Sequence, residues 1–85
     1  MTVTIGPTTT TTTRLIDARG SFCPGPLMEL IRAIRESEVG TLIAVRSSDR
    51  GSRIDIPKWV EKAGHRLVGV EQAEGYDEIV VEKLH

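Results

Sequence analysis

The sequence has a single cysteine, Cys23, among its 85 residues, and that scarcity excludes several kinds of site. One cysteine forms no internal disulfide and no Cys-x-x-Cys pair, which removes the dithiol chemistry of thioredoxin-like proteins. With His65 and His85 as its two histidines, the chain falls short of the roughly four Cys or His ligands of a structural zinc site, so we expect neither a metal nor a cofactor. A free thiol survives best in a reducing compartment, and the expected location is therefore the cytoplasm.

Long apolar runs and a surplus of basic residues are also missing. No apolar run approaches the roughly 20 residues that cross a bilayer, and the N-terminus lacks the charged and apolar segments of a secretory signal. The formal net charge of -1 argues against direct, stable binding of nucleic acid. The apolar and charged fractions, 39% and 27%, are typical of an ordinary folded domain. We expect a chain that binds neither nucleic acid nor membrane.

Residues 1–12 differ from the rest of the chain. Thr8 to Thr13 form an unbroken threonine run. Threonine favours extended backbone, but this run offers no apolar face to bury. We interpret residues 1–12 as a flexible, threonine-rich tail and residues 13–85 as a single domain. The alternative is that the run lengthens the first strand.

Hydrophobic spacing predicts two helices and four strands after the tail. Leu27, Leu30, Ile31 and Ile34 recur at the i, i+3, i+4 and i+7 positions of one helix face. Apolar or alternating segments bounded by turn residues predict strands. The expected elements, in order, are a strand at 14–18, a helix at 24–38 with Gly40 as its C-cap glycine, a strand at 41–46, a short helix ending at Gly64, and strands at 65–72 and 76–84.

The second helix is expected to begin close to Pro57, because proline suits a first helical turn. Asp55 or a nearby polar residue would then be its N-cap, and residues 49–52 would form a loop. Trp59 lies on the apolar face of this helix and is expected in the core.

The element order, β-α-β-α-β-β, defines a fold class. The two crossovers favour parallel neighbours, and a short turn at Glu74 and Gly75 favours an antiparallel hairpin at the end of the chain. Both helices then cover one face of a four-stranded mixed sheet, which gives an α+β two-layer sandwich. Ile79 and Val81 alternate with more polar positions and are expected to face the core.

Cys23 stands where the first predicted helix begins, among proline and glycine residues. A residue before proline avoids the helical conformation, so Cys23 is expected as the N-cap and Pro24 as the first helical residue. Pro26 has no N–H to offer, which leaves the N–H of Gly25 as the expected donor to the sulfur. The positive end of a helix lowers the pKa of a cysteine and favours the reactive thiolate, and the nearby Arg19 would add to this effect.

A small cysteine in the core is the competing interpretation, because free cysteines are often buried. The prolines and glycines around Cys23 favour an exposed cap, so the reactive thiol is preferred. His65 could serve as a base, but it is far from Cys23 in sequence. It is expected to be a hydrogen-bonded or merely exposed histidine.

The segment around Cys23 also resembles a known family. Asp17, Gly20, Cys23, Pro24 and Pro26 reproduce the D-x-x-G-x-x-C-P-x-P signature of the TusA/SirA/YedF sulfur carriers. The resemblance covers about residues 14–84 and continues through Gly40, Ser48 to Ser52, Asp55 to Pro57, Trp59, Gly64 and His65. A Cys-Pro-x-Pro element after a short strand is specific when this wider pattern accompanies it.

The resemblance implies both a fold and a function. The fold is that of the C-terminal domain of translation initiation factor three, which agrees with the element order above. Family members accept sulfane sulfur as a cysteine persulfide and pass it on, and Cys23 matches the residue that bears it. Donors include cysteine desulfurases or rhodaneses, and acceptors include DsrE-type proteins. Destinations include tRNA thiolation, molybdenum cofactor synthesis and sulfur oxidation. Such a protein is a sulfur carrier and at most a sulfurtransferase.

Three positions depart from the family pattern. Ser21 stands where leucine is frequent, Arg50 where proline is common, and Gly25 where a better helix former is frequent. Ser21 and Arg50 bear on the choice of partner. Arg32 and Arg35, on the outer face of the first helix, join Arg50 as candidates for partner docking, because charged rims steer association.

Two other functions remain as alternatives. One is a regulatory or protein-binding module that uses the exposed sheet face or the first helix, with Cys23 incidental. The other is a single-thiol redox sensor, in which peroxide oxidises Cys23 to a sulfenic acid.

Overall fold

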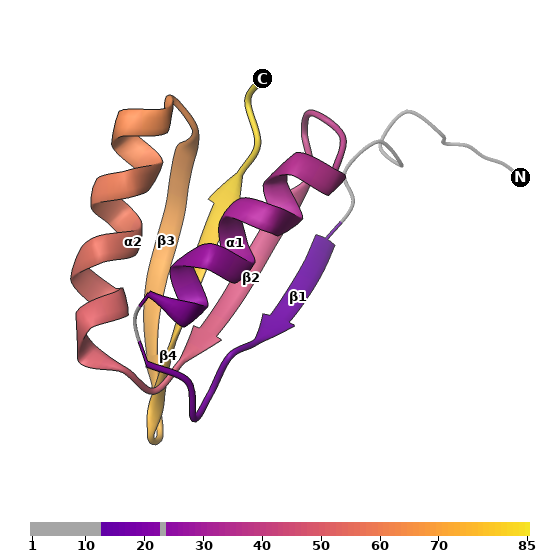
Figure 1. Ribbon diagram of the computed structural model, residues 1–85. Coiled ribbons are helices and arrows are strands. Elements are labelled where there is room, and N and C mark those ends of the chain that lie inside the picture. Colours follow the sequence, from indigo (N-terminus) through magenta and orange to yellow (C-terminus); the bar gives the residue numbers. More distant parts are fainter. Residues whose placement is uncertain (1–12, 23) are drawn as a thin grey trace, which may run out of the picture.

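The four strands and two helices follow one another in the order that the hydrophobic pattern predicts, β-α-β-α-β-β (Figure 1). The structure is a computed structural model, and it describes residues 13–22 and 24–85. The elements are β1 (Thr13–Asp17), α1 (Gly25–Glu36), β2 (Leu42–Ser47), α2 (Arg50–Ala63), β3 (Arg66–Ala73) and β4 (Tyr76–Glu82). The predicted tail at 1–12 and Cys23 itself lie outside the described residues.

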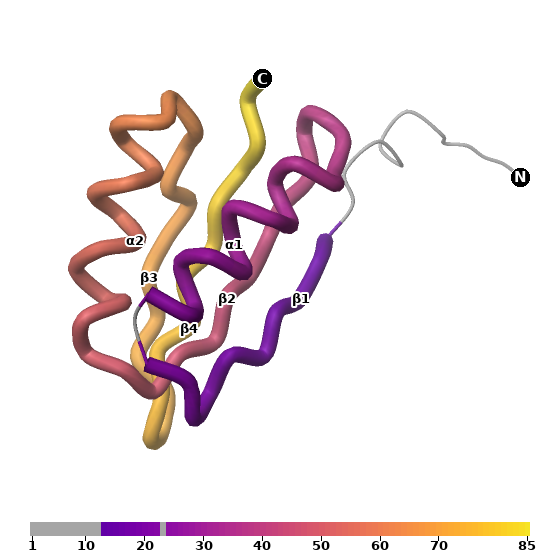
Figure 2. Tube along the Cα trace, in the orientation of Figure 1, coloured from indigo at the N-terminus to yellow at the C-terminus, as the bar shows by residue number. Residues whose placement is uncertain are grey.

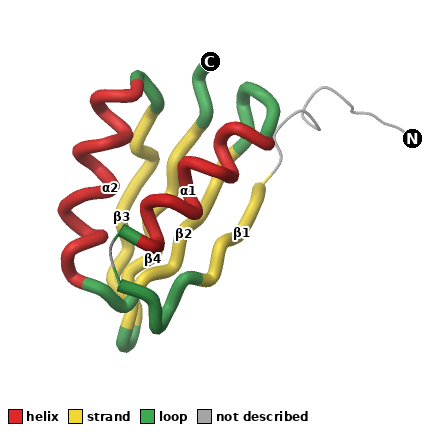
Figure 3. The backbone as a smooth tube through the Cα atoms, viewed as in Figure 1, coloured by secondary structure: helices red, strands yellow, loops and turns green. Residues whose placement is uncertain are grey.

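The four strands form one mixed sheet in the order β1-β2-β4-β3. β1 is parallel to β2, whereas β4 is antiparallel to both β2 and β3. Both helices cover the same face of this sheet (Figure 3), so the predicted two-layer α+β fold is confirmed. One connection differs from the prediction. The crossover through α2 does not join neighbouring strands, because β4 inserts between β2 and β3.

The core lies between the helices and the sheet, and every layer contributes aliphatic side chains. The fully buried ones include Leu30 from α1, Ile56 and Val60 from α2, and Ile43, Val45, Ile79 and Val81 from the two central strands. Ile79 and Val81 alternate with partly exposed residues along β4, as predicted. Trp59 packs against this cluster, which confirms its predicted place in the core.

α2 begins at Arg50, well before Pro57, so the loop predicted at 49–52 is wrong. Asp49 is the N-cap, and its carboxylate accepts the Ser52 N–H at 3.2 Å. A cap of this kind stabilises a helix by about 1 kcal/mol. α2 starts early because Asp49 caps it, whereas the sequence pattern placed Asp49 in a loop.

Pro57 consequently lies inside α2, and Asp55 precedes it within the helix rather than capping it. An interior proline removes one helical hydrogen bond and costs about 3 kcal/mol. Ile56 and Val60 lie one turn apart and are 0% and 1% exposed. Burial of each contributes about 1.5–3 kcal/mol, so packing against the sheet offsets the proline and keeps the helix continuous.

The helix ends differ from the prediction in one case and agree in the other. α1 ends at Glu36, and Ser37 leaves it in an extended conformation. Gly40 is therefore not its C-cap. The left-handed φ of 95° at Gly40 belongs to the loop that leads into β2. Gly64, with a φ of 82°, is the left-handed residue that closes α2, as predicted.

Two histidines join the C-terminus to the end of α2. His65 Nδ1 accepts the Leu84 N–H at 3.1 Å, and the His85 ring stacks on that of His65 with centroids 4.5 Å apart. His85 Nε2 lies 2.8 Å from the carbonyl oxygen of Ala63. Partial burial, followed by the charges of His85 and Lys83, lowers the pKa of His65. His65 is thus hydrogen-bonded and structural.

We expect the protein to lose stability as the pH falls from about 7.5 to about 5.5. The native state holds His65 with a pKa below its usual value of 6.5. The unfolded state therefore binds the proton more readily, and acid favours unfolding. The urea midpoint, measured across this range, should fall. In His65→Asn, whose amide oxygen can accept the Leu84 N–H without titrating, it should fall less. An equal pH dependence in both proteins would contradict this role for His65.

Candidate functional site

The chain passes from β1 to α1 through a short loop that is fastened to the end of β2 (Figure 2). The Ala18 N–H donates to the Arg46 carbonyl oxygen at 2.9 Å, which continues the parallel pairing one residue beyond β1. The Gly20 N–H donates to Ser48 Oγ, also at 2.9 Å. These bonds hold the loop at the carboxyl ends of two neighbouring strands.

Gly20 gives this loop its sharp change of direction. Its φ is 90°, in the left-handed region that residues with a Cβ rarely adopt. The following N–H, that of Ser21, returns to the Ala18 carbonyl oxygen at 3.1 Å. The glycine of the sequence signature is thus required by the backbone.

α1 begins one residue later than predicted. Pro24 is the N-cap, Gly25 is the first helical residue and Pro26, which is buried, is the second. The Gly25 N–H donates to the Phe22 carbonyl oxygen at 2.8 Å. The predicted donation of this N–H to the sulfur of Cys23 falls on a residue outside the described ones and stays a prediction.

The residues on both sides of Cys23 lie at the surface. Ser21, Phe22 and Pro24 are all exposed, and the Phe22 side chain is 78% exposed. Aromatic side chains are enriched at protein–protein interfaces, so an exposed ring next to Cys23 is a candidate contact for a partner. The sequence prediction overlooked Phe22, although an aromatic residue directly before the cysteine was a visible signal.

The Arg19 side chain interacts with Asp17 and with the ring of Tyr76. Its guanidinium pairs with both carboxylate oxygens of Asp17 at 2.8 Å and lies 5.0 Å from the centre of the Tyr76 ring. Hydrogen bonds from the Arg19 side chain and backbone lower the pKa of Asp17 to about 2. Arg46 approaches the same ring at 5.6 Å and pairs with Glu78 at 3.0 Å. This network ties the loop before Cys23 to the β3–β4 hairpin, and an effect of Arg19 on the thiol stays a prediction.

A groove runs along the outer side of α1 from its first residue. Its volume is about 570 Å³. We call it the α1 groove, and it is lined by Gly25, Met28, Glu29, Ile31, Arg32 and Arg35. Arg32 pairs with Glu36 at 3.4 Å, whereas Arg35 has no ion pair within residues 13–22 and 24–85. The structure thus brings two of the predicted docking arginines together.

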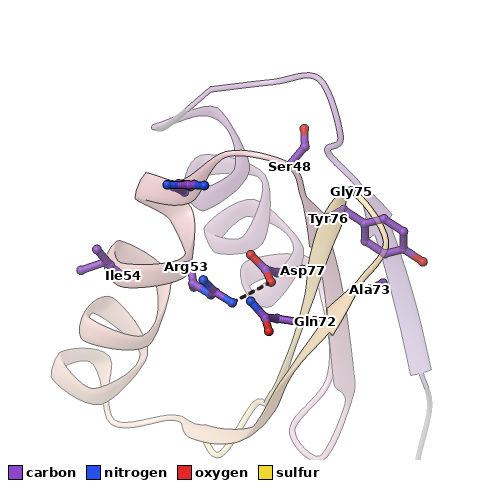
Figure 4. Close-up of a pocket in the computed structure, with 9 residues that line it drawn as sticks. Ser48, Arg53, Ile54, Gln72, Ala73, Gly75, Tyr76 and Asp77 are labelled. Carbon is purple, nitrogen blue, oxygen red and sulfur yellow. Dashed lines mark ion pairs between the residues drawn. The ribbon is translucent and has the colours of Figure 1, made fainter.

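Arg50, the third docking candidate, lines a different hollow of about 480 Å³ (Figure 4). This α2–hairpin hollow lies between the start of α2 and the β3–β4 hairpin, and its lining includes Ser48, Arg53, Ile54, Gln72 and Asp77. Arg53 pairs with Asp77 at 3.4 Å, as the dashed line in Figure 4 shows. Arg50 forms no ion pair with any described residue, so its charge is available to a partner.

Other kinds of site are not evident in the described part of the chain. It contains no group of three or more His, Cys, Asp or Glu side chains placed to hold a metal ion. No helix that the structure describes is both long and apolar enough to span a membrane. His65 follows the C-terminal end of α2, at the opposite end of the sheet from the start of α1 (Figure 1).

Known proteins are similar to this chain in sequence and in fold. The sequence profile of the family described as sulfurtransferase TusA matches residues 14–83. A protein of Archaeoglobus fulgidus named as a candidate sulfur carrier is 57% identical over 70 residues, which are 82% of this chain and 96% of that protein. Sulfur carrier protein TusA of Pseudomonas syringae is 42% identical over 60 residues, 71% of either chain. The crystal structure of a SirA-like protein from Desulfitobacterium hafniense has a TM-score of 0.73 at 28% identity, covering 84% of this chain and 97% of that one.

Gly20→Ala should destabilise the protein by about 1–2 kcal/mol, because a Cβ strains the backbone at a φ of 90°. Gly69→Ala is the matched control, since a Cβ at either glycine meets nothing within 4 Å and only Gly20 has a positive φ. The control should stay within about 0.5 kcal/mol of wild type. Urea unfolding measures both, and equal stability of the two variants would show that the loop does not need a left-handed residue.

Proposed function

The chain belongs to the TusA family of sulfur carrier proteins, and from that premise we propose that Cys23 carries the sulfur as a persulfide from a donor protein to an acceptor protein. The donor is a cysteine desulfurase or a rhodanese, and the acceptor is a DsrE-type protein. The protein acts in the cytoplasm, and its sulfur serves tRNA thiolation, molybdenum cofactor synthesis or sulfur oxidation. It takes sulfur from one protein and gives it to another, which distinguishes a carrier from an enzyme that turns over a small molecule.

Each transfer in this proposal is an exchange between a thiolate and a persulfide. The Cys23 thiolate attacks the outer sulfur of the donor's persulfide, and a new S–S bond forms as the donor's S–S bond breaks. The electron pair of the broken bond stays on the donor cysteine, which leaves as a thiolate, while the transferred sulfur keeps its proton. The acceptor thiolate then repeats the step on Cys23. The exchange needs no external oxidant and no second cysteine in this chain.

Exposure beside Cys23 is the observation that supports the proposal most strongly. Phe22 and Pro24 are both exposed, so a protein can approach the chain on either side of the cysteine. Direct transfer requires such access, because the two reacting sulfur atoms must come within bonding distance. A buried structural cysteine would need no exposed neighbours.

The start of α1 supports the anionic forms of the thiol and the persulfide. A helix N-terminus carries about half a positive charge, which stabilises a nearby anion. Pro24 and Pro26 fix the backbone of this first turn, and the hydrogen bond from Gly25 to Phe22 closes it. We propose that these residues, with Arg19, favour the thiolate through the field of the helix and the shape of its first turn.

The arginines beside the site are proposed to steer the partners. Arg32 and Arg35 line the α1 groove, which begins at the helix turn next to Cys23. Arg50 lines the separate α2–hairpin hollow. Exposed cations of this kind accelerate the approach of an acidic surface and contribute less to the lifetime of the complex.

Sulfur loading tests the function directly. Wild-type protein incubated with a cysteine desulfurase, pyridoxal phosphate and cysteine should gain the mass of one sulfur atom, and a reductant should remove it. Cys23→Ser should gain nothing, because serine forms no persulfide. Mass spectrometry of the intact proteins reads both. An unmodified wild type, or equal loading of Cys23→Ser, would refute the carrier role of Cys23.

Charge reversal in the α1 groove should slow loading by a protein donor. We expect Arg35→Glu to reduce the second-order rate by about three- to tenfold at low salt, with a smaller effect at high salt. Lys62→Glu is the control, because Lys62 is exposed in the last turn of α2, away from the start of α1 (Figure 1). Stopped assays analysed by mass spectrometry give the rates. Equal slowing by the two variants would show that overall charge, not the groove, governs the approach.

A further inference from the structure

Phe22 is a highly exposed aromatic residue next to Cys23, and neither the sulfur transfer nor the docking arginines proposed above give it a role. We propose that Phe22, together with Met28, is an apolar anchor that inserts into a pocket of the sulfur-exchanging partner protein, beside the partner's own reactive cysteine. The inference rests on the proposed function of Cys23, since it names the contact by which a protein partner would reach that residue.

Phe22 must lie within the footprint of any protein that exchanges sulfur with Cys23. Consecutive Cα atoms are about 3.8 Å apart, so the neighbour of the reacting residue is covered when two proteins bring their sulfur atoms together. Phe22 is 78% exposed in the free protein, and most of its ring surface is therefore available for burial in the complex. Burial of apolar surface contributes about 25 cal/mol per Å², and aromatic residues are enriched at the centre of interfaces for this reason.

The backbone of Phe22 is held in place although its side chain is free. Its carbonyl oxygen accepts the Gly25 N–H at 2.8 Å, and the preceding Ser21 N–H donates to the Ala18 carbonyl oxygen at 3.1 Å. The Gly20 N–H is bound to Ser48 Oγ. An aromatic side chain on a fixed backbone loses little conformational entropy on binding, which is the property of a pre-organised anchor.

Met28 is a second exposed apolar side chain, in the first turn of α1. It is 57% exposed, and its N–H donates to the Pro24 carbonyl oxygen at 2.8 Å, in the first turn of the helix. Side chains on a helix lean toward its N-terminus, so Met28 covers the end of α1 that joins Cys23. Met28 also lines the α1 groove with Arg32 and Arg35. The partner that fits this surface has an apolar pocket with an acidic rim on the side that faces these arginines.

The test compares a protein donor with a small donor that needs no interface. The protein donor is a cysteine desulfurase with cysteine, and the small donor is glutathione persulfide. Phe22→Ala should raise the concentration of carrier that half-saturates the desulfurase by about tenfold, the effect of removing a well-buried anchor. Loading by glutathione persulfide should change by less than about twofold, because no pocket is filled.

Two further variants complete the experiment. Phe22→Leu, which keeps an apolar side chain, should recover part of the loss. Val39→Ala removes an apolar side chain that is 63% exposed in the loop between α1 and β2, and it should load like wild type from both donors. Circular dichroism and urea unfolding show that each variant is folded.

The outcomes separate this inference from the function on which it rests. Unchanged half-saturation in Phe22→Ala would overturn the anchor while leaving the carrier intact. Equal slowing with both donors would also overturn it, because the effect would then lie in the reactivity of the thiol. Failure of wild-type protein to load from either donor would overturn the carrier function itself, and the anchor with it.

Discussion

Three hydrogen bonds donated by backbone N–H groups hold the chain before and after Cys23, and the rest of the site depends on them. The Ala18 and Gly20 N–H groups fasten the β1–α1 loop to the end of β2, and the Gly25 N–H closes the chain onto the Phe22 carbonyl oxygen. These bonds fix the backbone of the loop, while the Phe22 side chain stays exposed and free to meet another protein. This arrangement suits a carrier, whose reactive residue must be reached by more than one partner.

The contacts of the C-terminus and the loop proposed to carry sulfur lie at opposite ends of the sheet. The two histidines that join the C-terminus to α2 lie at one end, and the β1–α1 loop lies at the other (Figure 1). Two surfaces lead away from the loop end, the α1 groove and the α2–hairpin hollow, and they share no lining residue. A carrier with one thiol must meet its donor and its acceptor in turn. Separate surfaces would let these two proteins bind at different places on the chain.

The sequence predicted the sheet, the two helices and the buried face of β4, because apolar spacing reports burial directly. It misplaced the start of α2, since an interior proline is penalised locally, whereas the burial of Ile56 and Val60 that offsets it depends on the folded sheet. It did not predict the hydrogen bond from the Gly25 N–H to the Phe22 carbonyl oxygen, which depends on how the loop folds back on itself. The sequence shows an aromatic residue directly before the cysteine, but the exposure of its side chain depends on the folded loop.

Passage of one labelled sulfur atom through the chain tests the central claim most directly. Protein loaded with a heavy sulfur isotope is separated from its donor and mixed with a DsrE-type acceptor in its reduced form, and both proteins are followed by mass spectrometry. The account predicts that the heavy atom leaves Cys23 and appears on a cysteine of the acceptor. Retention of the label on Cys23, or its release as sulfide while the acceptor stays unlabelled, would contradict it.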